Sequence, residues 1–197
     1  AATEADVPKP SFLVATGGTI TSCGNYKIHT FTGPGSFTVC TVGNSAGSNT
    51  IDYLVVAGGG GGASTGGGGG AGGVRFFASP DITSYPASPR NGPGALPVAA
   101  TTYPVTIGGG GTAGPSTPGV QGGCGVASTF AGTTTITSAG GGGAGSNPTT
   151  AGKPGGSGGG AGRDANTGTV GSGNTPPVTP SQGSNGGNSP TAGYSGG

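Results

Sequence analysis

The sequence predicts an all-β protein with no helices: a small antiparallel, sandwich-like part followed by a glycine-rich region of polyglycine-II segments and extended loops. The first reason is that no window free of Gly and Pro has apolar residues at helical spacing. The second is that strand-like apolar runs pass directly into runs of glycine. This join occurs at residues 51–62, 103–111 and 133–143.

The composition limits how large a hydrophobic core this chain can build. Of 197 residues, 52 are Gly and 17 are Pro, and only 29% are hydrophobic. Ordering a glycine in regular structure costs roughly 0.5–1 kcal/mol relative to Ala, so backbone hydrogen bonds between closely spaced chains must offset that cost. Disorder is the alternative that such a composition suggests. Against it stand the β-branched and aromatic islands and the low content of charged residues, 6%.

We expect three regions. Residues 1–10 form an extended arm, because Pro8 and Pro10 fix their own φ angles and favour extended geometry in the residues before them. Residues 11–57 form the antiparallel β part, and residues 58–197 form the glycine-rich part. The chain has no initiator Met and ends within glycine-rich composition, so we expect it to be a fragment or a processed form that continues beyond residue 197.

In the β part, residues 11–15 and 19–21 are predicted as short strands. Residues 26–31 and 36–42 alternate in polarity around a four-residue Thr-Gly-Pro-Gly turn, which predicts a hairpin. Its register places Phe31 opposite Ser36, and Lys27 opposite Cys40. Residues 50–57 are predicted to be the most buried strand. Asp52 and Lys27 are candidates for an ion pair between strands.

Glycines in the second region recur with a period of three, the number of residues in one turn of a polyproline-II helix. A face of glycines can then lie directly against neighbouring helices of the same kind. The recurring positions are Gly58, Gly61, Gly67, Gly70 and Gly73, and then Gly156, Gly159, Gly162, Gly168 and Gly171.

A proline-rich stretch, residues 78–104, is predicted as a long irregular loop after a short strand at 74–77. Aromatic residues flank it and are the candidate receptor or partner contacts: Phe76, Phe77, Tyr85 and Tyr103. The alternative, which we favour, is that these rings fill gaps between glycine layers. Residues 171–180 and 182–197 are predicted as extended chain.

No catalytic, cofactor-binding or metal site is predicted. His29 is the only histidine, and the five acidic residues are scattered. G-x-G-x-x-G matches occur only in low-complexity sequence with no helix to follow them. We expect Cys23, Cys40 and Cys124 to be free thiols, because their odd number and the predicted register do not favour pairing. A Cys23–Cys40 disulfide remains the alternative.

The charge pattern argues against two classes of partner. With a formal net charge of +1 and no basic cluster, neither nucleic acid nor a lipid surface is indicated. No stretch approaches the roughly 20 apolar residues of a membrane-spanning helix, and the N-terminal residues show no secretion signal.

Several stretches resemble the glycine-rich domain proteins of tailed bacteriophages, especially marine ones. They are residues 16–21, 26–31, 53–62, 103–111 and 173–178. The texture of the chain also resembles, more distantly, the receptor-recognising adhesin at the fibre tip of T-even phages, in which stacked polyglycine-II helices support variable loops. The resemblance implies a virion structural protein of a tail fibre, spike or other appendage that contributes to host attachment.

We therefore expect a non-enzymatic virion component, assembled in the host cytoplasm and then extracellular. Its expected partners are further copies of itself, as a homotrimer, other virion proteins, and a glycan or protein of the host surface. A chain this poor in core residues gains from burying strands against its own copies. The alternatives are a glycan-binding adhesin module that uses residues 78–104, a capsid-surface decoration protein, and an ice-binding polyglycine bundle.

Overall fold

The computed structural model describes residues 7–64, 66–79, 89–147, 151–162 and 169–188. It is an all-β fold, and the described residues contain no helix. The strands are β1 (Val14–Thr16), β2 (Thr19–Cys23), β3 (Tyr26–Thr30), β4 (Gly35–Thr41), β5 (Thr50–Ile51), β6 (Tyr53–Val56), β7 (Val74–Phe77), β8 (Leu96–Pro97), β9 (Thr102–Thr106), β10 (Ser128–Ala131) and β11 (Thr135–Ser138).

The hydrophobic core lies on one face of a five-stranded antiparallel sheet in the order β1-β4-β9-β10-β11. Side chains alternate between the faces of a strand, and every second residue of the central strands is buried. The buried residues include Phe37, Val39, Tyr103, Val105, Phe130 and Ile136. The sheet joins the region 11–57 to the region 58–197, because β1 and β4 come from the first and the other three strands from the second.

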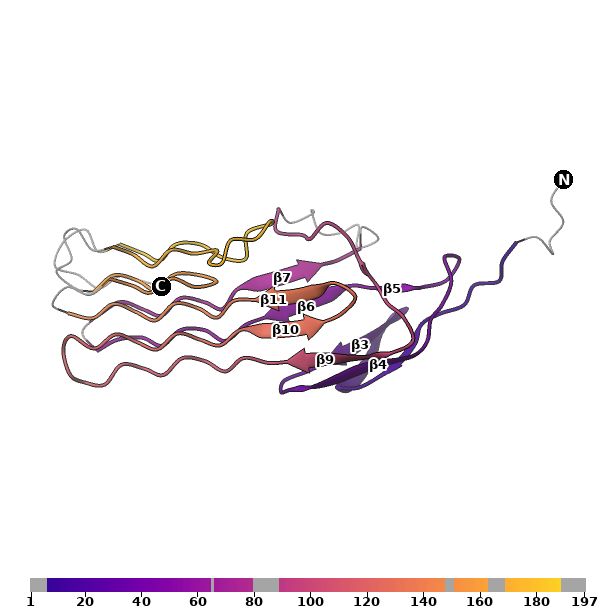
Figure 1. The fold of residues 1–197 in the computed structure, drawn as a ribbon, viewed down its shortest axis with the longest axis horizontal. Coiled ribbons are helices and arrows are strands. Elements are labelled where there is room, and N and C mark those ends of the chain that lie inside the picture. The colour runs from indigo at the N-terminus through magenta and orange to yellow at the C-terminus, as the bar shows by residue number, and fades with distance from the viewer. Residues whose placement is uncertain (1–6, 65, 80–88, 148–150, 163–168, 189–197) are drawn as a thin grey trace.

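A second layer closes over this core. The β6–β7 ribbon contacts β11, and Tyr53 and Val55 of β6 pack against the buried cluster. Leu96 of β8 is buried in the same cluster and pairs with Ile51 of β5. Residues 89–101 lie between β7 and β9 in the sequence, and Figure 1 shows this segment crossing the strands. The apolar alternation of short strands is thus enough to make a small two-layered core.

The predicted hairpin of residues 26–31 and 36–42 is wrong. β3 pairs instead with β2, through a two-residue turn at Gly24-Asn25, and Lys27 lies opposite Ser22. β4 pairs with β1 and β9. The left-handed φ of Gly24, 56°, suits the tight turn. The two-residue connection between β2 and β3 therefore forms a hairpin, whereas the four-residue connection between β3 and β4 does not.

The prediction for residues 50–57 is also wrong in its burial. This stretch forms two short strands, β5 and β6, and Leu54 and Val56 point to solvent with 68% and 50% of their surface exposed. The ribbon lies on the outside of the core, so only its inner face is covered. Asp52 makes no ion pair with Lys27; its carboxylate accepts hydrogen bonds from the Ser79 backbone N–H and hydroxyl, at 2.7 and 2.8 Å.

Beyond the strands the chain continues as extended glycine segments that lie side by side and lengthen the molecule in one direction (Figure 1). Several of these segments prolong a strand: segment 57–63 follows β6, 107–114 follows β9, and 139–146 follows β11. The others are 66–73, 120–127, 151–156, 157–162, 169–173 and 182–187. We refer to all of these as the glycine segments.

The glycine segments are joined by backbone hydrogen bonds that repeat every three residues. Gly141 and Ala144 donate to segment 57–63, at 2.9 and 3.0 Å, and the next two amides in register, Gly142 and Gly145, donate to segment 157–162, both at 2.9 Å. A three-residue repeat directed at different neighbours is what polyproline-II geometry provides, since successive N–H groups point about a third of a turn apart. The predicted polyglycine-II segments are therefore present.

Segment 139–146, which we call the central segment, is among the most enclosed of these. It also accepts bonds from segments 66–73, 120–127 and 151–156, and residues 141–146 are all buried. A Cβ added at Gly142 would collide with the carbonyl oxygen of Lys153. Glycine is needed here because neighbouring backbones occupy the space that a side chain would take.

Candidate interaction surfaces

The structure separates the predicted contact aromatics. Tyr103 is buried, with 5% of its surface exposed, and its hydroxyl oxygen accepts a hydrogen bond from the Ala99 N–H at 2.7 Å. It contacts Phe130, with the ring centroids 5.7 Å apart, and so belongs to the core. Phe76 and Phe77 are half-buried on β7. Tyr85 lies outside the described residues.

The outer face of the β6–β7 ribbon carries an uncharged apolar patch. Residues directly opposite each other in an antiparallel pair share a face, and the register pairs Leu54 with Phe76 and Val56 with Val74. Leu54 and Val56 are largely exposed, and their two partners are half-buried. Exposed apolar patches of this kind mark contact surfaces more often than chance would place them. We call these four residues the ribbon patch.

The β2–β3 hairpin stands out from the core with most of its residues exposed. His29 anchors it: the ring Nδ1 lies 2.8 Å from the Gly17 carbonyl oxygen, and the ring meets Phe37 edge-on with centroids 5.0 Å apart. Ile28 and Tyr26 are exposed at 45% and 52%. His29 thus has a structural role in the described residues.

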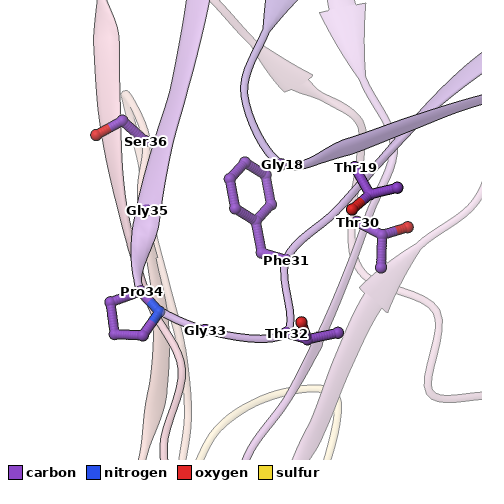
Figure 2. Close-up of a pocket in the computed structure, with 9 residues that line it drawn as sticks. All are labelled: Gly18, Thr19, Thr30, Phe31, Thr32, Gly33, Pro34, Gly35 and Ser36. Carbon is purple, nitrogen blue, oxygen red and sulfur yellow. The ribbon is translucent and has the colours of Figure 1, made fainter.

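Figure 2 shows a shallow depression, about 250 Å³ in volume, between the β2–β3 hairpin and the start of β4. The Phe31 ring stands between Gly18 and Gly35, and a Cβ at either glycine would come within 3.2 Å of ring atoms. The hydroxyls of Thr19 and Ser36 lie on opposite sides of the ring and do not converge (Figure 2). The depression is therefore a packing site for Phe31.

A second depression, of about 350 Å³, lies on the inner side of the β6–β7 ribbon. Its walls come from β6, β7, the turn before β11, and the segment that leads into β8. It differs from the first in holding an aromatic ring and a cation together. Its lining residues are Tyr53, Arg75, Pro93, Gly94, Ala95, Leu96, Pro97, Thr134 and Ile136.

At the end of the bundle far from the sheet, the turn at residues 115–119 connects the glycine segments 107–114 and 120–127 (Figure 1). Ser146, at the end of the central segment, is fully buried and connects this turn to residue 64. Its hydroxyl accepts a hydrogen bond from Gly119 N–H at 3.1 Å and lies 3.2 Å from the Ser64 carbonyl oxygen. The Gly119 N–H also bonds the Asn147 carbonyl. Residue 64, the turn at 115–119 and residues 146–147 are thereby held together, and we call these residues the bundle tip.

Comparison with protein families now adds to this geometry. A family model described as a glycine-rich domain matches residues 30–197. The chain belongs to the glycine-rich domain family. The match begins at the end of β3 and includes every glycine segment, as well as the strands β4 to β11. No curated protein and no solved structure matches the chain.

In this glycine-rich domain protein the three cysteines are exposed free thiols. The described residues contain no group of three or more His, Cys, Asp or Glu side chains placed to hold a metal ion. Among the same residues, no helix long and apolar enough to cross a membrane is found.

Sequence reasoning missed several buried polar residues of the glycine-rich domain, among them Ser146 and Gln182. Both lie in polar, low-complexity sequence, where one Ser or Gln looks like any other. A weak signal was present for Gln182, because it is a long amide in a stretch of otherwise small residues. A long side chain with a donor and an acceptor suits a position where several backbone groups need partners.

Proposed function

We propose that this glycine-rich domain protein is a non-enzymatic structural component of a tailed bacteriophage particle, as part of a tail fibre, spike or other surface appendage that contributes to host attachment. The observation that carries the proposal is the three-residue hydrogen-bond repeat that links the glycine segments into one bundle continuous with the β sheets. Such a bundle supports a rod that is thin and stiff, because its internal contacts are made largely by backbone.

The composition of the bundle also favours a particle surface. Few charged side chains project from it, and the formal net charge of the chain is +1. Because exposed charge drives non-specific attraction to nucleic acid and membranes, a nearly neutral rod avoids those contacts. Specific recognition is then made by residues at the ends of the rod.

The bundle tip is one part that we assign to host contact. Ser146 holds the turns near Ser64 and Gly119 together, so side chains of different turns keep fixed relative positions. Loops on a rigid scaffold are where binding residues commonly lie, since they vary without disturbing the core. Attachment through such a tip is consistent with the resemblance to phage appendage proteins.

Self-association is the second part of the proposal. The ribbon patch offers Leu54 and Val56 as exposed apolar side chains, and none of its four residues is charged. We assign it to contact with further copies of the same chain in a homotrimer, because an obligate homo-oligomer interface is apolar and resembles a divided core.

Gold-labelled antibody against the purified chain tests the function on phage particles whose genome encodes it. We expect label on an appendage, at a constant distance from the capsid, and a slower rate of adsorption to cells after antibody treatment. Particles that lack the chain altogether, with the protein found only in the soluble lysate, would contradict the proposal.

A further inference from the structure

The depression on the inner side of the β6–β7 ribbon has features of a ligand-binding site. Its volume, about 350 Å³, lies within the range of small-molecule sites, roughly 300–1,000 Å³. Buried Leu96 and Ile136 form part of its floor, and these side chains belong to the core cluster. The site is therefore built on the hydrophobic core.

Arg75 is the one cationic side chain among the described residues that line this depression. It is half-buried, and the register of β7 with β6 places it opposite Val55, on the same inner face as Tyr53. Among the described residues its guanidinium has no hydrogen bond or ion pair. Removing part of a charge from water without a partner is unfavourable, so an anion bound in the depression would complete the site.

The remaining walls restrict what that anion can be. Tyr53 presents an aromatic ring, and Pro93, Pro97 and Leu96 present apolar surface. A bare inorganic anion would leave these walls without a contact. A sugar ring has an apolar face that packs on aromatic and aliphatic side chains, and hydroxyls that bond to polar groups such as Thr134.

We propose that this depression binds an acidic sugar unit, with its carboxylate on Arg75 and its ring against Tyr53. The planar guanidinium can donate two parallel hydrogen bonds to one carboxylate. The exposed Thr134 hydroxyl lies at the rim, where a sugar hydroxyl would reach it. This inference rests on the proposed function, because it names the class of host-surface molecule that an attachment protein would contact.

The test is a titration of the full chain with three probes, followed by NMR chemical shifts or calorimetry. Glucuronate has both the carboxylate and the ring, glucose has only the ring, and acetate has only the carboxylate. We expect glucuronate to bind about tenfold or more tightly than either of the others, because glucose lacks the charge-assisted hydrogen bonds to Arg75 and acetate lacks the ring contact with Tyr53. Equal binding of acetate and glucuronate would overturn the assignment to a sugar.

Variants decide whether Arg75 carries the binding. Arg75→Gln is expected to weaken glucuronate binding about tenfold or more. Arg75→Lys is expected to weaken it by less, because lysine keeps the positive charge but lacks the planar guanidinium that donates two parallel hydrogen bonds. Arg90→Gln is the matched control, since Arg90 bonds to Ser184 and does not line the depression. Thermal melts by circular dichroism report whether each variant is folded, and Arg75→Lys is the deciding variant if Arg75→Gln unfolds.

Unchanged glucuronate affinity in a folded Arg75 variant would overturn the inference, as would equal losses in the Arg75 and Arg90 variants. Either result leaves the location of the chain on phage particles untouched. The antibody-labelling experiment measures that location without any sugar. Failure of the sugar site and failure of the proposed function are thus separate outcomes.

Discussion

The side-chain oxygen of Gln182 accepts a hydrogen bond from the backbone N–H of Ala139 at 2.7 Å, although the two residues lie 43 positions apart. The amide nitrogen of the same side chain donates to the Pro176 carbonyl at 2.8 Å. The Gln182 backbone carbonyl accepts from the Val74 N–H at 2.9 Å. With 1% of its surface exposed, Gln182 joins the last glycine segment to β7 and to the start of the central segment.

Replacing this amide should destabilise the fold without changing its outline. Gln182→Leu keeps most of the volume but removes the partner of the half-buried Ala139 N–H, and a buried unpaired group costs about 1–3 kcal/mol. Pro176 is exposed, so water can replace the bond to its carbonyl. We expect a loss of about 1–3 kcal/mol in the free energy of unfolding, measured with urea. Gln121→Leu is the control, because Gln121 is half-buried and its side-chain amide donates to the Ala151 carbonyl. Equal losses in the two variants would contradict a special role for Gln182.

Glycine should be required at some positions of the bundle and dispensable at others. Gly142→Ala places a methyl group against the Lys153 carbonyl oxygen in the buried central segment, and we expect a loss of about 3 kcal/mol or more from overpacking. Nothing lies within 4 Å of a Cβ at Gly109. Gly109→Ala should therefore leave stability unchanged or raise it by about 0.4–1 kcal/mol through the unfolded state. Thermal unfolding of both variants compares them directly, and a tolerated Gly142→Ala would mean that the segments are not packed as described.

The ribbon patch should control self-association. Leu54→Lys places a charge where we expect a second copy to pack, so the chain should elute as a monomer in size-exclusion chromatography with light scattering, whereas the unaltered chain forms a trimer. Val120→Lys is the control, because Val120 is exposed at 41% and lies in the bundle. A monomeric unaltered chain would refute the homotrimer, and a trimer that persists in Leu54→Lys would move its interface elsewhere.

The thiols should react in the folded protein. Cys23, Cys40 and Cys124 are exposed and free, and exposure controls how readily a thiolate meets a reagent. We expect iodoacetamide to modify each of them without denaturant, with mass spectrometry of the peptides as the measurement. Protection of Cys23 and Cys40 together, lifted by a reducing agent, would instead indicate the disulfide that the sequence left as the alternative.

Much of the fold followed from local pattern. The stretches 74–77, 103–107 and 133–139 contain β7, most of β9 and all of β11, because β-branched and aromatic runs bounded by glycine have few other ways to pair. The three-residue period of the glycines could also be recognised in the sequence, because a side chain is tolerated only where no neighbouring backbone approaches. These patterns depend on short stretches of sequence, so they could be recognised without knowledge of the tertiary structure.

The pairing of strands that lie far apart in the sequence could not be predicted. β4 bonds to β9, with Phe37 opposite Tyr103, and nothing near either residue specifies that partner. The strand β10 was missed, because Ser128 to Ala131 offers a single large apolar residue. Tyr103 was chosen as a contact for its position beside a loop, yet its alternation with Val105 puts both in the core. Burial depends on which sheets meet, and that is decided by the whole chain.

Amide hydrogen exchange, resolved by residue, tests the central claim that the glycine segments form a bonded bundle. The account predicts that Gly141, Gly142, Ala144 and Gly145 exchange as slowly as the paired amides of β9 and β10, because all of them open only with the core. Exchange of the central segment at the rate of an unstructured chain, while the strands stay protected, would contradict it.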